Sequence, residues 1–402
     1  MNKVKFLYKK LVIIAVISIM SLFAITGCKK SGDAKTDENV LVIGGQNPET
    51  GPMADYGSKT VLGAKLAFEE INANGGINGK KIVFNSHDSR GEKTDAVNLT
   101  RRLTKNNVCA IIGEITSGGF LAMRERANDA GTVAISTGAT VEHVTEKMVG
   151  NKYEHIPFAF RNTLRDSEGA PSLVNFLVQN KGFKKFAIIT SMNNEYSVAL
   201  SGFFRDAVKN AGVTVVAEQS INDGDADVSA QITSIKNSGA DAIIFTGYYQ
   251  EAARILTTMK NQGVTAKLVG GDGFQSPDLW NLAGDAAIGT IFYSGFSPES
   301  ERENIKIFKA KMLEIGKEAD TFSAQGYDAA YLLAEAMKKA NVTDCSDASQ
   351  RDAIRAQLML IKDFEGVTGT MSIDETGSTV KEPFILEINK NEDGTYGTKS
   401  LN

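Results

Sequence analysis

The chain has 402 residues, a length that suits two domains of ordinary size. Its formal net charge of −4 is close to balance, which argues against nucleic acid as a partner. With 3 cysteines and 3 histidines, the composition excludes a disulfide framework and a zinc cluster, and we expect neither a metal nor a cofactor.

The N-terminus has the pattern of an exported protein. Lysines gather in residues 3–10, and residues 11–25 form an apolar run typical of a secretory signal peptide. Directly after it, Ile25, Thr26, Gly27 and Cys28 resemble the bacterial lipobox, in which the cysteine receives a lipid. We therefore expect a lipoprotein signal peptide over residues 1–27 and lipidation at Cys28. The alternatives are a plain signal peptide with an incidental cysteine, or an uncleaved anchor helix.

Residues 28–39 are polar and charged without apolar periodicity, so they are expected to form a flexible tether. Together with the lipid, this tether would place the folded part outside the cytoplasm, anchored to the bacterial cell membrane.

Short apolar strands then alternate with amphipathic helices. Strands are expected at 40–43, 81–84, 108–112, 133–135, 186–189, 213–217, 242–245, 268–270 and 290–292. Helices are expected at 59–74, 94–105, from 120 onward, and at 167–180, 197–210, 228–237, 251–261, 304–315, 324–339 and 349–361. A last strand pair is expected at 369–373 and 383–388, with a turn at 374–377 between them. This alternation predicts an α/β fold with parallel sheets and right-handed crossovers.

The number of strand–helix units exceeds one comfortable sheet, so the chain is expected to form two α/β lobes. The strand-poor block at 301–362, followed by the strand pair, suggests that the chain returns to the first lobe before it finishes on the second. We expect lobe 1 to contain residues 40–160 and 295–366, and lobe 2 to contain residues 161–294 and 367–402. The chain would then cross between the lobes near Phe160, Ser294 and Gly366.

Two turns in the first lobe carry small hydroxyl residues. The strand at 108–112 is followed by Thr116 and Ser117, and the strand at 133–135 is followed by residues 136–140, with sequence STGAT. Glycines and small hydroxyl residues leave backbone N–H groups open at a helix N-terminus, which favours an anion. In a doubly wound sheet both turns lie at the carboxyl edge, where ligands bind. Taken alone, two ordinary strand–helix turns remain the alternative.

The second lobe offers an acid and several aromatic side chains. Asp272 stands between glycines directly after a strand, where it could be a turn former or the partner of a ligand ammonium. Tyr248 also follows a strand and a glycine, and Tyr56 and Tyr196 are expected in loops just before helices. Aromatic groups at such positions are common in small-molecule pockets, although each alone is more often a packing residue.

Enzyme signatures are missing from the sequence. The glycines near residue 45 lack the GxGxxG spacing, and neither GxxxxGK[ST] nor GxSxG occurs. We expect no chemical role for Cys109, in an apolar strand, or for Cys345, near a loop. The three histidines are expected to be surface loop residues.

Four motifs together resemble a known family. They are TGPMADYGSKTVLGAKLAFEEINANGGINGKKI, AIIGEITSGG, ISTGAT, and GGDGF followed by SPDLWNLAG. In these motifs the chain resembles the periplasmic-binding-protein-type receptors for leucine, isoleucine and valine, the solute-binding subunits of branched-chain amino acid ABC transporters. The resemblance extends from residue 40 to about residue 388. It implies the periplasmic binding protein type I or Venus-flytrap fold, with two Rossmann-like lobes joined by a hinge of three crossovers.

The resemblance also implies a binding site. Ser117 and Thr140 match hydroxyls that hold the ligand α-carboxylate, and the carbonyl of Gly138 matches an acceptor for the α-ammonium, which Thr140 shares. Asp272 matches an acid, often glutamate in the family, that pairs with the ammonium. The pocket wall is matched by Tyr56, Ile115, Tyr196, Tyr248 and Phe322. The family disulfide near this pocket is not expected, because Ser89 and Thr116 occupy its neighbourhood.

The resemblance finally implies a function. The expected protein is a monomeric, lipid-anchored binding protein that delivers an amino acid, expected to be aliphatic, to the membrane subunits of an ABC permease. It would have no catalytic residues. The alternatives are a binding protein for another small carboxylate or amide, and a ligand-sensing receptor subunit that signals through a membrane partner. An α/β enzyme such as an esterase would need a nucleophile motif that the sequence lacks.

Overall fold

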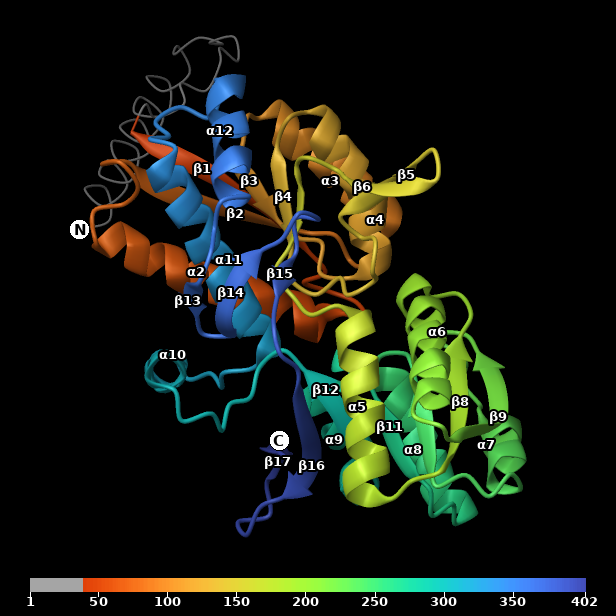
Figure 1. Ribbon diagram of the computed structural model, residues 1–402. Coiled ribbons are helices and arrows are strands. Elements are labelled where there is room, and N and C mark those ends of the chain that lie inside the picture. Colours follow the sequence, from red (N-terminus) through yellow and green to blue (C-terminus); the bar gives the residue numbers. More distant parts are fainter. Residues whose placement is uncertain (1–38) are drawn as a thin grey trace, which may run out of the picture. The chain divides into compact units, whose positions relative to one another are not determined.

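The computed structural model describes residues 39–402 (Figure 1). The expected signal peptide, the lipidation site Cys28 and all but the last residue of the expected tether lie outside these residues. No helix within residues 39–402 is long and apolar enough to cross a membrane.

The first sheet has five strands in the order β2-β1-β3-β4-β7. Their bounds are β1 (Val40–Asn47), β2 (Lys81–Asp88), β3 (Ala110–Ile112), β4 (Val133–Ser136) and β7 (Ala159–Arg161). The pairs β1–β3, β3–β4 and β4–β7 are parallel, as the alternating pattern predicted. The helices that accompany this sheet are α2 (Ala54–Ala73), α3 (Lys93–Lys105), α4 (Ser117–Asp129), α11 (Thr321–Lys339) and α12 (Ala348–Leu358).

Successive residues of a buried strand point to opposite faces, and β3 shows why both faces of this sheet are covered. Ile112 packs in a cluster with Phe68 of α2 and Leu333 of α11. Its neighbour Ile111 packs instead with Leu103 of α3 and Phe120 of α4. Figure 1 accordingly shows α2, α11 and α12 on one side of the sheet, and α3 and α4 on the other.

The second sheet has seven strands in the order β17-β16-β12-β11-β10-β8-β9. Their bounds are β8 (Lys185–Ser191), β9 (Thr214–Ile221), β10 (Ala242–Phe245), β11 (Lys267–Gly270), β12 (Ile291–Ser294), β16 (Phe384–Lys390) and β17 (Tyr396–Ser400). The strands from β9 to β12 pair in parallel, whereas β16 and β17 are antiparallel additions at one edge.

The second sheet buries both faces in the same way. Ile188 of β8 packs with Leu173 of α5 and Leu200 of α6, and the next residue, Ile189, packs with Leu256 of α8 on the other face. The helices of this part are α5 (Asp166–Lys181), α6 (Glu195–Asn210), α7 (Ser229–Lys236), α8 (Tyr249–Gln262) and α9 (Pro277–Ala283), with short 3₁₀ turns η1 (Asp272–Phe274) and η2 (Gly284–Ala287). The expected strands and helices are therefore present, with ends shifted by a few residues.

The chain passes between the two sheets after β7, after β12 and before β16, and these connections are fastened to the first half of α11. The amide nitrogen of Asn162 donates to the carbonyl of Gln325 at 2.9 Å, and the hydroxyl of Ser294 lies 2.8 Å from that of Thr321. On the last connection, the buried ammonium of Lys381 donates to Asn162 Oδ1 at 2.7 Å.

The strands after α12 differ from the expectation. The structure forms a small sheet in the order β13-β14-β15, with bounds β13 (Phe364–Gly366), β14 (Gly369–Ile373) and β15 (Thr379–Val380). The expected pairing of 369–373 with 383–388 is wrong, because the turn at 374–377 leads into β15, whereas β16 pairs with β12 and β17. Since Met371 and Ile373 pack in the core of the first sheet, the chain stays against that sheet beyond Gly366, where the crossover was expected.

Cys109 and Cys345 form a disulfide, so the expectation that neither cysteine has a chemical role is wrong. Their Cα atoms lie 4.9 Å apart although 236 positions separate them in sequence. The bond joins the residue before β3 to the loop between α11 and α12, and both cysteines belong to the core of the first sheet. Such a separation gives no spacing signal, so only the fold shows the pair.

A two-stranded hairpin, β5 (Glu146–Val149) with β6 (Lys152–His155), was also not expected. It contains His155, and His87 lies in β2, so these two histidines are in half-buried strand positions and not in surface loops. A further helix, α10 (Glu303–Glu314), follows β12 as the sequence predicted.

Candidate functional site

A pocket lies where residues that follow strands of both sheets come together. This is the carboxyl edge of the parallel strands, where ligands bind in open α/β sheets. The lining residues are Tyr56, Ile115, Thr116, Ser117, Gly138, Tyr196, Tyr248, Asp272, Gly273 and Phe322. The structure thus brings together eight of the nine ligand-binding residues that the sequence singled out, and their roles toward a ligand stay predictions.

The first sheet contributes a helix N-terminus. Helix α4 begins at Ser117, and the hydroxyl of Thr116 caps it by accepting from the N–H of Gly119 at 3.2 Å. Both Thr116 and Ser117 line the pocket. A helix N-terminus presents unpaired N–H groups and the positive end of the helix dipole, so this side of the pocket suits an anion.

Gly138, in the turn after β4, is a close-packing position. A Cβ atom on Gly138 would lie 2.5 Å from Cγ1 and 2.8 Å from the carbonyl oxygen of Ile115. A side chain would therefore push apart the two turns that follow β3 and β4. Glycine lets both turns reach the same pocket.

Thr140 is the predicted residue that does not line the pocket. It is fully buried, and its carbonyl accepts from the backbone N–H of Asp166 at 3.2 Å and from Arg161 Nη1 at 3.1 Å. Burial raises the pKa of the Asp166 carboxyl to about 6, against the lowering effect of the hydrogen bond from Tyr293. The hydroxyl of Thr140 is buried and has no hydrogen-bond partner among the described residues.

The second sheet contributes Asp272, which opens the turn η1 after β11. Its carboxylate is buried and accepts from the hydroxyl of Tyr196 at 3.0 Å. Burial, reinforced by the charge of Asp166, raises the pKa of Asp272 to about 7. A carboxyl at this pKa ionises readily when a cation comes beside it.

Aromatic rings form the walls between these two ends. The rings of Tyr196 and Tyr248 stack with their centroids 5.3 Å apart, and the ring centroids of Tyr56 and Phe322 are 4.4 Å apart. Tyr56 and Tyr196 were expected in loops, but both lie in the first turn of a helix, α2 and α6 respectively. The sequence placed the start of each helix too late, because the first turn is polar or glycine-rich. Such a turn lacks the periodic apolar residues that mark a helix in sequence.

Several contacts connect residues of the first sheet's helices and loops to those of the second. The hydroxyl of Tyr56 donates to the carbonyl of Gly273 at 2.5 Å, and that of Tyr249 donates to the carbonyl of Pro52 at 3.0 Å. A half-exposed ion pair joins Lys93 to Glu195. It lines a wider, more open cavity that shares Thr116 and Tyr248 with the pocket.

Sequence reasoning missed part of the site. Gly273 lines the pocket, and so does Thr116, which was noted in its turn but not assigned to the site. Behind Asp272, the buried Asp166 accepts from the hydroxyl of Tyr293 at 2.8 Å. Asp166 is the first residue of α5, where acids are common for capping reasons alone, so its position carried no signal.

Within residues 39–402 no group of three or more His, Cys, Asp or Glu side chains could hold a metal ion.

Known proteins share this fold and its length. The family model for periplasmic binding proteins matches residues 41–394. A Leu/Ile/Val-binding protein homolog from Brucella melitensis is 28% identical over 88% of this chain and 92% of its own. A branched-chain amino acid transporter substrate-binding protein from Streptococcus pneumoniae, solved in complex with isoleucine, is 32% identical with a TM-score of 0.80 over 90% of this chain and 99% of its own. A leucine-binding protein from Thermotoga maritima is 28% identical with a TM-score of 0.80 over 89% and 97% of the two chains.

Proposed function

Because the chain belongs to the periplasmic binding protein family, we propose that it is the substrate-binding subunit of an ABC transporter. Its ligand would be an aliphatic amino acid such as leucine, isoleucine or valine, held in the pocket between the two sheets and delivered to a membrane permease. The observation that carries this proposal is the pairing of a helix N-terminus with a buried acid across one small pocket. A zwitterionic amino acid has the complementary pair of charges.

The carboxylate end of the ligand is assigned to Ser117 and the first turn of α4. The hydroxyl of Ser117 and the open N–H groups of that turn would donate to the α-carboxylate, and the helix dipole favours its charge. The carbonyl of Gly138 lies on the same side and is available to accept from the α-ammonium. Thr140 is proposed to act on both groups, because its buried hydroxyl, although not part of the pocket lining, has no hydrogen-bond partner among the described residues.

The ammonium end is assigned to Asp272. Without a ligand this carboxyl has a pKa of about 7, because burial penalises its charge. An ammonium group beside it reverses that penalty, and the resulting charge-assisted hydrogen bond is stronger than a neutral one. Tyr196 keeps the carboxylate in place through its hydroxyl, whose pKa burial raises well above the usual range, so that it remains a donor.

The side-chain end is proposed to be apolar. Tyr56 already donates to Gly273 O, and Tyr196 to Asp272. With these hydroxyls engaged, the walls offer ring faces and the apolar Ile115 and Phe322 to a ligand, and an aliphatic side chain loses water-exposed area there without leaving a polar group unpaired.

Location and anchoring are part of the same proposal. The lipobox-like residues that end in Cys28 support a lipid anchor outside the cytoplasm. The disulfide between Cys109 and Cys345 supports the same location, since such bonds persist in oxidising compartments. The protein would bind its ligand as a monomer without catalysing a reaction.

A ligand screen tests the proposed function. The purified protein is heated with each of the common amino acids, and the increase in unfolding temperature is recorded. A ligand at about 100 times its dissociation constant adds about 2.7 kcal/mol of stability, which is readily seen as a shift. We expect leucine, isoleucine or valine to give the largest shifts and the matching 2-oxo acids to give much smaller ones. Stabilisation by the oxo acids equal to that by the amino acids would contradict the assignment of a zwitterion site.

A further inference from the structure

Arg161 ends β7, and its guanidinium is buried with 1% of the residue exposed. Among the described residues its acceptors are carbonyl and hydroxyl oxygens and not carboxylates. Nη1 donates to the carbonyls of Ala139, Thr140 and Val141 at 3.5, 3.1 and 2.7 Å, and Nη2 donates to that of Glu142 at 3.2 Å. Taking a cation out of water is expensive, so a buried arginine needs a specific set of partners, and here four consecutive carbonyls supply most of it.

Those carbonyls belong to the turn that Gly138 opens, and Gly138 lines the pocket. In a trans peptide the C=O and N–H groups point in opposite directions, so carbonyls that converge on Arg161 turn the following N–H groups away from it. A cation bound to the carbonyl also polarises the peptide and strengthens its N–H as a donor. The guanidinium therefore fixes the conformation of residues 139–142 and makes this turn a better environment for an anion.

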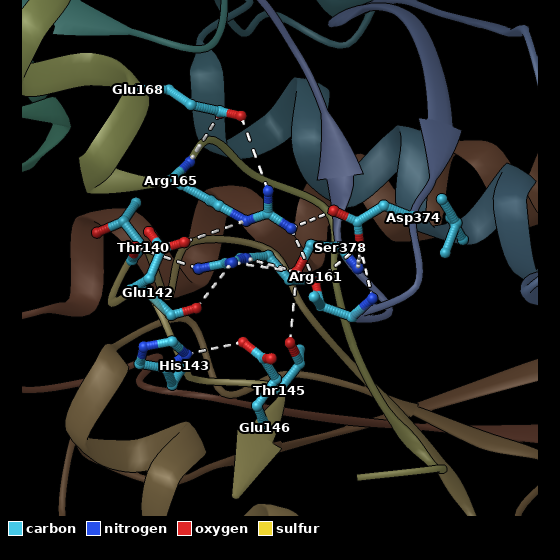
Figure 2. Close-up of polar contacts among 12 residues, drawn as sticks. Thr140, Glu142, His143, Thr145, Glu146, Arg161, Arg165, Glu168, Asp374 and Ser378 are labelled. Atoms are coloured by element: carbon cyan, nitrogen blue, oxygen red, sulfur yellow. Dashed lines mark hydrogen bonds and ion pairs between the residues drawn. The ribbon is translucent and has the colours of Figure 1, made fainter. Parts of the chain in front are cut away.

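The same guanidinium reaches a second segment. Nε and Nη2 donate to the hydroxyl of Ser378 at 3.2 and 3.0 Å, and the backbone N–H of Arg161 donates to the carbonyl of Gly377 at 3.0 Å. Figure 2 shows Arg161 between Thr140 and Glu142 on one side and Ser378 on the other. Arg161 lies just before the first connection between the sheets, and Ser378 lies shortly before the last. The Arg161 side chain therefore joins residues 139–142, which we call the ligand turn, to both of these connections.

We propose that Arg161 is a positioning residue for ligand binding, which holds the backbone of residues 139–142 in its binding-competent shape and ties that turn to the segments connecting the two sheets. This inference rests on the proposed function, since it concerns how the same pocket is kept ready for the ligand carboxylate. Arg161 acts through the backbone and does not itself line the pocket.

Arg165 provides a matched control. It is an arginine four residues along, and it is fastened to the same segment, through an ion pair with Asp374 and a 2.8 Å hydrogen bond to the hydroxyl of Thr376. Its contact with Glu142 is a 3.9 Å approach of side chains and does not involve the backbone carbonyls. Replacing Arg165 thus disturbs the 374–378 turn without removing a donor from the ligand turn.

The test compares full-length wild type with Arg161→Gln, Arg161→Lys and Arg165→Lys in two measurements. The first is amide hydrogen exchange of residues 138–142 without ligand, with β10 as an internal reference. We expect exchange of this turn to be at least about tenfold faster in both Arg161 variants and unchanged in Arg165→Lys, while exchange in β10 stays the same in all proteins. The lysine keeps the charge but offers a compact ammonium in place of the planar fork, so Arg161→Lys should fall between the wild type and Arg161→Gln.

The second measurement is calorimetric affinity for the amino acid that stabilises the wild type most. Because only the competent fraction binds, a turn that is ordered about a tenth of the time lowers the apparent affinity about tenfold. We expect that loss in Arg161→Gln, a smaller one in Arg161→Lys and none in Arg165→Lys. Should Arg161→Gln fail to fold, Arg161→Lys carries the comparison.

Wild-type exchange of residues 138–142 in a folded Arg161 variant would overturn the proposal, as would an equal effect of Arg165→Lys. If the wild type binds none of the amino acids, the proposed function fails, and the exchange measurement still decides the role of Arg161.

Discussion

The hydroxyl of Tyr56 lies 2.5 Å from the carbonyl oxygen of Gly273 and donates to it. Tyr56 belongs to the first turn of α2, which accompanies the first sheet, whereas Gly273 belongs to the turn after β11 of the second sheet. One hydrogen bond at the pocket wall therefore connects the two halves of the site. A contact of this kind exists only when both halves are together, so it should stabilise the ligand-bound arrangement specifically.

We predict that Tyr56→Phe raises the dissociation rate of the amino acid. The ring remains in the wall, and the lost neutral hydrogen bond is worth about 0.5–1.5 kcal/mol, or roughly two- to tenfold in affinity. Stopped-flow measurement of ligand release checks this. Tyr331→Phe is the control, because the Tyr331 hydroxyl donates to Glu70 at 2.8 Å away from the pocket lining and its removal should leave ligand release unchanged. Release rates that are equal in wild type and Tyr56→Phe would show that the contact does not hold the ligand.

We predict that Asp272→Asn weakens binding of the amino acid far more than binding of the matching 2-oxo acid. The variant keeps the shape and one acceptor but removes the charge that would pair with the ammonium. Loss of one partner of a buried charge pair costs about 2–5 kcal/mol, mostly because the other charge stays unpaired. Calorimetry with both ligands on both proteins isolates the pairwise effect. An equal loss for the two ligands would make Asp272 a structural turn residue.

The raised pKa of Asp272 predicts how affinity depends on pH. At pH below about 7 the ligand-free carboxyl is protonated, so an ammonium that needs the carboxylate must displace a proton. Affinity should therefore fall as the pH drops below 7, by up to about tenfold per pH unit when one proton is displaced. Between pH 7.5 and 8.5, where the carboxyl is mostly ionised, affinity should stay nearly constant. Calorimetry in buffers of different ionisation enthalpy should detect proton release at pH 6. A pH dependence that persists in Asp272→Asn would assign the effect to another group.

Three buried carboxyls, Asp272 among them, make the stability of the ligand-free protein depend on pH in the opposite direction to the affinity. Burial raises the pKa of Asp272 to about 7, that of Asp166 to about 6, and that of Glu114, a buried residue in the turn between β3 and α4, to about 8. The folded state then holds these protons more tightly than the unfolded state, so their contribution is largest at low pH and is lost as the pH rises through these values. The increase in unfolding temperature caused by a saturating amino acid should accordingly be larger at pH 8 than at pH 5.5. Identical increases at both values would contradict this.

The disulfide yields a stability prediction. Cys109→Ala combined with Cys345→Ala should lower the free energy of unfolding by about 2–4 kcal/mol, as measured in urea, because the unfolded chain regains freedom that the bond removes. Neither cysteine lines the pocket, so the affinity for the amino acid should stay within about twofold of wild type when measured well below the unfolding transition. Wild type unfolded in the presence of a reductant should match the double variant.

The expected lipid anchor has its own test. Cys28→Ala should abolish metabolic labelling with a fatty acid and leave the protein released or unprocessed, because a flexible tether with one or two acyl chains is what holds such a domain at a membrane. Labelling of the variant equal to that of the wild type would assign the lipid elsewhere.

Residues that are marked by their place in a strand–turn–helix unit were found from the sequence. Asp272 after β11 and Ser117 at the start of α4 are of this kind, because the end of an apolar run and a glycine-rich turn are local signals. The fold class followed from the same alternation, and the family resemblance supplied wall residues such as Phe322, which no local pattern singles out.

What the sequence did not predict depends on contacts between distant segments. The sequence does not reveal the disulfide of Cys109 with Cys345 or the pairing of β16 with β12, because each joins segments that are far apart in the chain and meet only in the folded structure. Arg161 is the clearest case, because a single arginine at a strand end has no pattern. Its role appears only once the carbonyls of residues 139–142 are seen around it.

The fastening of the connections to α11 has a mechanical consequence. Asn162 and Ser294 bind residues on the first half of this helix, and Lys381 is tied to it through Asn162. An assembly held along one short line can turn about that line but cannot readily slide or twist across it. We therefore expect the second sheet to rotate about α11 as a rigid body when the ligand enters or leaves.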